Sequence, residues 1–189
     1  MDSHSVALDF LNTRKYVKGR MTDLISTPEQ LRAWLLRVGL DAYGIDVEIS
    51  PPAARLLFDE THRLRDAIRA AVAAQARGET VPPRSLYALN RVLEASRFTT
   101  QLVQSGERLA LIERDAAPAP LTVLSPIALA AATLLTEVDR RRIRQCRSDQ
   151  CGLWFLDTSK NRRRQWCSMA TCGNRAKAAR HYQKQSTLP

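Results

Sequence analysis

The four cysteines of this 189-residue chain all lie within one 27-residue stretch. They form two pairs, Cys146 with Cys151 and Cys167 with Cys172, and four residues separate the members of each pair. Zn²⁺ takes four thiolate ligands in a tetrahedron, and such closely spaced pairs are typical of zinc sites. A disulfide framework would need an oxidising compartment, which nothing in the sequence indicates. The spacing therefore predicts one Zn²⁺, and its role is structural because four thiolates leave no position open for substrate.

Positive charge is concentrated around these cysteines. The chain has 29 Lys and Arg against 19 Asp and Glu, a formal charge of +10. Residues 140–189, here the C-terminal module, carry +11, whereas residues 1–139, the N-terminal body, carry −1. A basic segment attached to a neutral body indicates a nucleic-acid or anionic-membrane partner, and a solubilising tail would explain the charge equally well.

The pattern around the cysteines predicts a treble-clef-like arrangement. Residues 154–156 are a strand-like apolar run, residues 157–161 have turn-forming side chains, and residues 164–166 return toward Cys167. This order predicts a hairpin between the two cysteine pairs. No helix breaker follows Gly173, so a helix is expected from about residue 171 to 185, with the second pair at its start. A module this small and polar cannot build an adequate core, so zinc must stabilise it.

The expected C-terminal helix carries one basic face. Helical spacing places four basic side chains together with Asn174 at their edge, and the preceding turn adds further cations. The candidate DNA-binding residues are Lys160, Asn161, Arg162, Arg163, Arg164, Asn174, Lys177, Arg180, His181 and Lys184. The two asparagines are equally suited to capping local backbone. Arg175 falls on the other side of the helix and is expected to brace the hairpin.

The N-terminal body is expected to be mainly helical with a small antiparallel β-hairpin. Residues 6–13 read as a short strand or helical turn entering the core, and a polar loop follows to residue 23. Thr27 is the expected N-cap of the next helix, with Gln30 completing a capping box. Helices are predicted over residues 28–38, 51–78, 83–95 and 125–138, and the hairpin over 98–103 and 108–113. No Gly- or Pro-rich linker separates residues 138 and 146, so the two parts are expected to be coupled.

Short segments in both parts match a family pattern. Residues 167–177, CSMATCGNRAK, resemble the CGNR zinc finger, a bacterial treble-clef-like module, and residues 155–161 and 166–167 are similar to its hairpin. Residues 7–13, ALDFLNT, resemble the start of the ABATE domain that usually precedes this finger. The resemblance implies a stress-related transcription regulator that binds DNA through the finger. Gln165 departs from the pattern, because a basic residue is common there, and removes one expected phosphate contact. The expected fold class is α+β, with an ABATE-like domain over 1–139 and a treble-clef-like zinc finger over 140–189.

The N-terminal body shows no sign of catalytic chemistry. The histidines, His4, His62 and His181, lie in no recognisable triad or metal pattern, and Gly-rich phosphate signatures are absent. The protein is therefore expected not to be an enzyme. Asp9, Asn12 and Arg14 form a polar cluster beside an apolar segment. They either satisfy backbone groups or line a small-molecule pocket that makes the body a sensor.

These observations favour a DNA-binding transcription regulator whose partner is duplex DNA. An RNA- or protein-binding zinc module, and an enzyme with a substrate pocket in the body, are the alternatives. With no secretory signal or membrane span in the sequence, we expect a cytoplasmic, nucleoid-associated protein without a membrane partner. A small-molecule effector and a homodimer both fit this function, although no heptad or apolar stripe assigns a dimer interface.

Overall fold

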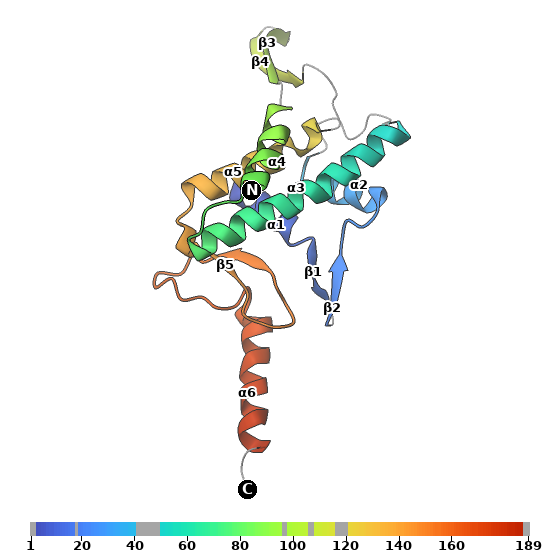
Figure 1. Ribbon diagram of the computed structural model, residues 1–189. Helices are drawn as coiled ribbons and strands as arrows, with labels where there is room; N and C mark the ends of the chain where they lie inside the picture. Colours follow the sequence, from blue (N-terminus) through green and yellow to red (C-terminus); the bar gives the residue numbers. More distant parts are fainter. Residues whose placement is uncertain are drawn as a thin grey trace.

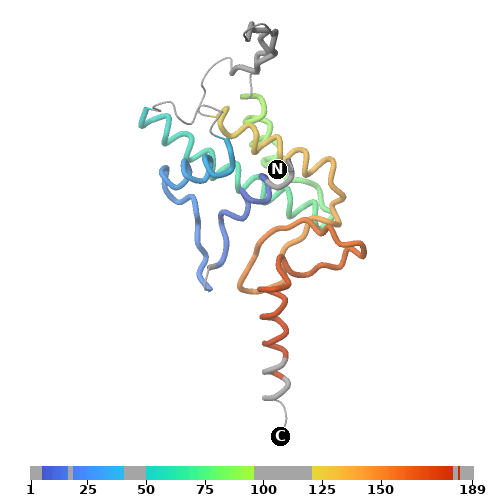
Figure 2. The backbone as a smooth tube through the Cα atoms, turned by 180° about the vertical axis from the view of Figure 1, so that it is seen from behind, coloured from blue at the N-terminus to red at the C-terminus, as the bar shows by residue number. Residues whose placement is uncertain are grey.

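A helical body and a smaller C-terminal module make up the chain, and a single long helix projects from the module away from the body in both views (Figures 1 and 2). The computed structural model describes residues 3–17, 19–40, 50–95, 98–105, 108–115 and 121–186. In chain order its elements are α1 (Ser3–Leu11), β1 (Arg14–Val17), β2 (Arg20–Asp23), α2 (Pro28–Arg37), α3 (Pro51–Arg77), α4 (Pro83–Glu94), β3 (Phe98–Ser105), β4 (Arg108–Asp115), the 3₁₀ turn η2 (Thr122–Leu124), α5 (Ser125–Glu137), the 3₁₀ turn η3 (Arg140–Arg142), β5 (Ile143–Gln145), β6 (Trp154–Leu156), the π-helical turn η4 (Met169–Gly173) and α6 (Asn174–Ser186). None of the helices in these ranges has the length and apolar character needed to cross a membrane.

The core of the body forms where α1, α3, α4 and α5 pack together. Apolar residues spaced three and four apart put Leu57, Leu64, Ile68 and Val72 of α3 into this core. Residues 6–13, expected to be a strand or a helical turn, belong largely to α1, whose Phe10 is fully buried. The four predicted helices are confirmed as α2, α3, α4 and α5.

Local capping chemistry sets the helix ends close to where the sequence indicates. The Thr27 hydroxyl accepts a hydrogen bond from the Gln30 amide at 3.3 Å, which is the predicted N-cap of α2. The side chain of Gln30 does not complete a capping box with Thr27, because its Oε1 accepts from the amide of Ser26 at 2.9 Å. Gly78 ends α3 in the left-handed region, with φ +75, which glycine adopts without steric cost.

Two antiparallel hairpins accompany the helices of the body. β3 pairs with β4, which confirms the predicted hairpin and extends it to residues 98–105 and 108–115. The expectation of a loop over 14–23 is wrong, because β1 pairs with β2 in register from Arg14↔Asp23 to Val17↔Arg20. In these strands apolar and polar side chains do not alternate, so no local sequence pattern predicts the hairpin. It depends on a contact with another part of the fold. Arg65 of α3, 2% exposed, donates to Oδ1 of Asp23 at 2.7 Å and anchors the end of β2.

The C-terminal module contains a hairpin, but around the first cysteine pair. β6 pairs with β5, in register from Ile143↔Leu156 to Gln145↔Trp154. The predicted hairpin between the two cysteine pairs is therefore wrong. The returning segment forms no ladder with β6, since Arg162 has φ +52 and the Arg164 amide donates to the Asp157 carboxylate. The expected helix is confirmed as α6, preceded by the π-helical turn η4.

Candidate metal centre and nucleic-acid interface

The four cysteine sulfurs converge on one point in the C-terminal module. Their Sγ atoms all lie within 4.8 Å of one another, with Cys151 and Cys167 at 3.4 Å and Cys167 and Cys172 at 3.7 Å. Tetrahedral Zn²⁺ with Zn–S bonds of about 2.3 Å separates its sulfurs by about 3.8 Å. The donor set and the spacing therefore fit one zinc ion, and the four cysteines are its ligands.

Short local motifs position the cysteine side chains. Cys146 follows β5 and its amide donates to the Leu153 carbonyl at 2.8 Å, which closes the loop that carries Cys151. Gly152 turns the chain back toward β6 with φ +70. In the second pair, the Ser168 hydroxyl accepts from the Thr171 amide at 3.3 Å and starts η4, which buries Cys172. The metal site is thus built from a loop between two strands and one helical turn.

The chemistry of the cluster favours a bound cation. Burial raises the pKa of Cys167, and the neighbouring sulfurs raise it further. Four thiolates at these distances repel one another unless a positive ion lies between them. A Zn²⁺ held by the four cysteines would supply that charge and would join the loop to η4. Phe155 is buried in the same cluster as Cys146, Cys151 and Cys172, and Trp166 packs against it.

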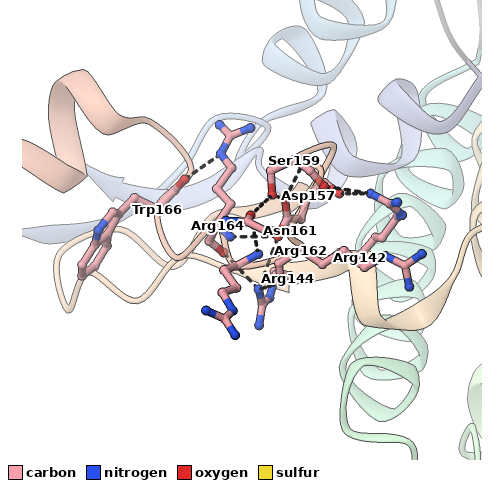
Figure 3. Close-up of polar contacts among 9 residues, drawn as sticks. Arg142, Arg144, Asp157, Ser159, Asn161, Arg162, Arg164 and Trp166 are labelled. Carbon is pink, nitrogen blue, oxygen red and sulfur yellow. Dashed lines mark hydrogen bonds and ion pairs between the residues drawn. The ribbon is translucent and has the colours of Figure 1, made fainter.

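A buried carboxylate organises the turn beside the metal centre (Figure 3). Asp157 has no exposed surface, and it accepts hydrogen bonds from the Ser159 amide at 3.0 Å, the Arg164 amide at 2.9 Å and Nη1 of Arg144 at 3.3 Å. Burial alone would raise the pKa of Asp157, but these hydrogen bonds outweigh it and lower the pKa to about 2. The carboxylate therefore stays charged and fixes the turn, a role that the sequence did not reveal because its partners lie up to 13 residues away.

Two of the arginines predicted to contact DNA are used inside the protein. Arg164 donates to the carbonyl of Trp166 at 2.9 Å and to that of Cys167, and its guanidinium lies 4.9 Å from the centre of the Phe155 ring. Arg162 forms an ion pair with Asp139, with Nη1 2.9 Å from Oδ2. These side chains hold the returning segment in place. Their guanidinium donors, which the charge pattern alone assigns to DNA, therefore bind groups of the protein.

The two predicted asparagines also make local hydrogen bonds. Asn161 accepts from the Ser159 hydroxyl at 3.1 Å and from the Arg163 amide at 3.3 Å within its turn. Asn174 donates to the Ala170 carbonyl at 3.2 Å and joins η4 to α6. Both therefore take the capping role that the sequence left open.

Other predicted cations remain available at the surface. Within the described residues no hydrogen bond or ion pair engages the side chains of Lys160, Arg163 or Lys177, all of which are exposed. Arg180 is exposed, and in the part of the chain that the structure describes its guanidinium uses only Nε, which donates to the Ala176 carbonyl at 3.3 Å. Arg147, which is not among the residues predicted to contact DNA, is likewise exposed and free within the described part of the chain. The side chains of His181 and Lys184 lie outside the described residues.

The polar cluster of the body splits between two roles. Asn12 faces the C-terminal module, where its Nδ2 donates to the Trp154 carbonyl and its Oδ1 accepts from the Trp154 amide, both at 2.9 Å. Both polar ends of this side chain therefore bind backbone. Asp9 and Arg14 are exposed, and partial burial raises the pKa of Asp9 while Arg37 opposes the rise. No hydrogen bond joins these three residues to one another within the described part of the chain.

Further contacts fasten the module to the body. Trp154 and Ile143 belong to the same apolar core as α1 and α5, and the Tyr16 ring lies beside Gly152 of the metal-binding loop. Arg140 lies against Gly78, where the carbonyl end of the α3 dipole attracts a cation. The expectation that the two parts are coupled is confirmed.

The fold and this site define a class of protein: a helical body whose core continues into a four-cysteine zinc finger. The chain belongs to the ABATE family, described as "Putative stress-induced transcription regulator", whose model matches residues 4–138. The CGNR zinc finger model matches residues 142–185. No curated protein matches the chain.

Proposed function

We propose that this protein regulates transcription by binding duplex DNA through its C-terminal module, and that it acts by binding rather than catalysis. The single observation that carries the proposal is the exposure of α6, which extends away from the body and packs mainly on the turn η4 before it (Figure 1). A helix that stands clear of its own protein can enter the major groove.

The division of labour among the basic side chains supports the same proposal. Arg142, Arg144 and Arg164 donate to carbonyls of the module itself, and Arg162 pairs with Asp139, the last residue of the body. Lys177 on α6 and Lys160 and Arg163 on the turn have no such partner among the described residues, which suits them to phosphate contacts. The family description, a stress-induced transcription regulator, agrees with a protein that binds DNA.

The attachment of the module supports a regulatory role for the body. Asn12 in the loop after α1 holds both backbone groups of Trp154 in β6, so a displacement of α1 reaches the strand that leads out of the metal-binding loop. In this proposal a small-molecule effector binds the body and changes how rigidly α6 is held for contact with DNA.

The test is a titration of duplex DNA at several salt concentrations. Replacing Lys177, Arg180 and Lys184 together by Gln should weaken binding and lower the slope of log K against log salt by about 2.7, since each phosphate contact contributes roughly 0.9. Replacing Arg55, Arg77 and Arg84 by Gln removes the same charge from exposed positions on the body and should leave the slope unchanged. Binding that does not depend on salt, or no binding to duplex DNA, would contradict the proposal, and preference for structured RNA would favour an RNA-binding module.

A further inference from the structure

A groove lies beside the metal centre, between the cysteine-bearing loop and the first two turns of α6. Its volume is about 480 Å³, and three separate segments line it: residues 147–150, residues 165–166, and positions 175, 176, 179 and 180 of α6. Volumes of roughly 300–1,000 Å³ are typical of small-molecule sites. Since zinc fixes the loop and α6 relative to each other, the groove is a built feature of the holoprotein.

Three guanidinium groups give the groove its charge. Arg147, Arg175 and Arg180 line the groove together with one carboxylate, that of Asp149. Nη1 of Arg175 donates to Oε1 of Gln150 at 3.3 Å, which braces Arg175 across the groove. Within the described residues nothing engages the guanidinium of Arg147 or the two Nη atoms of Arg180. These free donors suit an anion with several oxygens, such as a phosphate.

An aromatic wall completes the groove. Trp166 packs against the cysteine cluster and also lines the groove, as well as a second hollow that it shares with Arg163 and Met169. Its indole points away from the Asp157 cluster (Figure 3). Ala176 and Ala179 also line the groove, and their small side chains leave the space open. Indole faces stack with nucleobases of any sequence.

We propose that this groove binds one nucleotide, with its phosphate on Arg147 and Arg180 and its base against Trp166. The nucleotide is either a free mononucleotide or an unpaired nucleotide of a nucleic-acid strand, because both present the same chemistry. The inference goes beyond the proposed function, which uses paired DNA. The two share Arg180, so the groove is tested at Arg147 and Ala179, which the duplex test leaves unchanged.

The zinc-loaded full chain offers a direct readout. Trp34 and Trp154 are only 3% and 6% exposed, so quenching of tryptophan fluorescence by a bound ligand reports Trp166. The probes are AMP, an oligo-dT of ten nucleotides and inorganic phosphate. AMP should quench the fluorescence and saturate, and Arg147→Gln should weaken its binding roughly tenfold.

Two matched alanine substitutions locate the site. Ala179→Leu fills the groove and should weaken AMP binding roughly tenfold or more, because stacking space is lost. Ala178 is also exposed on α6 but does not line the groove, so Ala178→Leu should leave binding unchanged. Leucine and alanine are both strong helix formers, so α6 persists in either variant.

The outcomes separate the sources and the two proposals. If AMP quenches the fluorescence and oligo-dT does not, the occupant of the groove is a free nucleotide. If oligo-dT quenches it as well, the occupant is an unpaired nucleotide of a nucleic-acid strand. Phosphate binding as tightly as AMP, no saturable quenching by AMP or oligo-dT, or equal loss in Ala179→Leu and Ala178→Leu would overturn the nucleotide site. Binding of AMP without binding of duplex DNA would refute the proposed function and support this inference. Binding of duplex DNA without binding of AMP would support the proposed function and refute this inference.

Discussion

The N-terminal body and the C-terminal module solve the same problem, holding a chain in one conformation, by different physical means. The body buries apolar side chains such as Phe10, Leu64 and Ile127, which have 1% or less of their surface exposed. The module instead joins its segments with four cysteines and with arginines that donate to carbonyls. A basic chain of about 50 residues has too little apolar surface to bury. Some of its charged side chains therefore stabilise the module itself, while others face the solvent.

The difference matters for function because it divides the positive charge into two sets. Arg164 binds carbonyls within the module and Arg162 pairs with Asp139 at the junction with the body, whereas Lys177 and Arg147 have no internal partner in the described residues. A charge count predicts an anionic partner but does not distinguish these sets. Substitutions in the first set should disturb the fold, and substitutions in the second should disturb binding alone.

The largest expected effect comes from removing the metal. Chelation with EDTA, or Cys172→Ser, should unfold the module, since structural zinc of this kind contributes on the order of 10–16 kcal/mol. Circular dichroism should show the loss of α6, while the helices of the body remain but melt at a lower temperature because Trp154 and Ile143 leave their core. A C-terminal helix that survives chelation would mean that the module does not depend on zinc.

Breaking the joint between the two regions should cost less. Asn12→Ala removes two hydrogen bonds and leaves both backbone groups of Trp154 unpaired, which should lower the free energy of unfolding by about 1–3 kcal/mol. Thermal melts of the zinc-loaded protein measure this loss. Asp9→Ala is the control, since Asp9 lies one turn earlier on α1 and is exposed. Equal stability of the Asn12 and Asp9 variants would show that the Asn12 hydrogen bonds do not help to hold the two regions together.

A smaller effect is expected at the buried carboxylate of the module. Asp157→Asn keeps the shape but removes the charge that binds the Arg164 amide and Arg144, and zinc affinity should fall on the order of tenfold, as for residues that support metal ligands. A competition assay with a colorimetric chelator measures it, with Asp149→Asn on the exposed side of the loop as the control. Because hydrogen bonds lower the pKa of Asp157 to about 2, its contribution should persist from neutral pH to about pH 4 and disappear only as the pH falls toward 2.

The smallest expected effect concerns the body. Burial, and then the charge of Arg65, lower the pKa of His62, whose Nδ1 lies 2.8 Å from Nη2 of Arg65. The unfolded chain binds a proton at this histidine near pH 6.5 and the folded chain resists it, so stability should fall as the pH drops below about 6.5. Denaturant melts at pH 7.5 and 5.5 test this. The decline should become shallower in His62→Gln, and an unchanged slope would remove His62 as its cause.

Much of the fold follows from local sequence signals. Thr27 and Gly78 mark the ends of helices because capping depends on atoms within a few residues. The hairpin β1–β2 gave no such signal, since its strands are charged and its end is held by Arg65 from α3. The pairing of β5 with β6 was missed for a similar reason, because Ile143-Arg144-Gln145 reads as a charged junction.

By itself, the sequence determined the four zinc ligands, the location of the charge and the periodicity of the helices, because each depends on residue type and on short, regular spacing. Only the tertiary structure decided which cations are free, which strand β6 joins and what Asn12 binds. A guanidinium group carries five donors on a long side chain and reaches carbonyls far along the chain. The partner of such a group is therefore a property of the folded molecule.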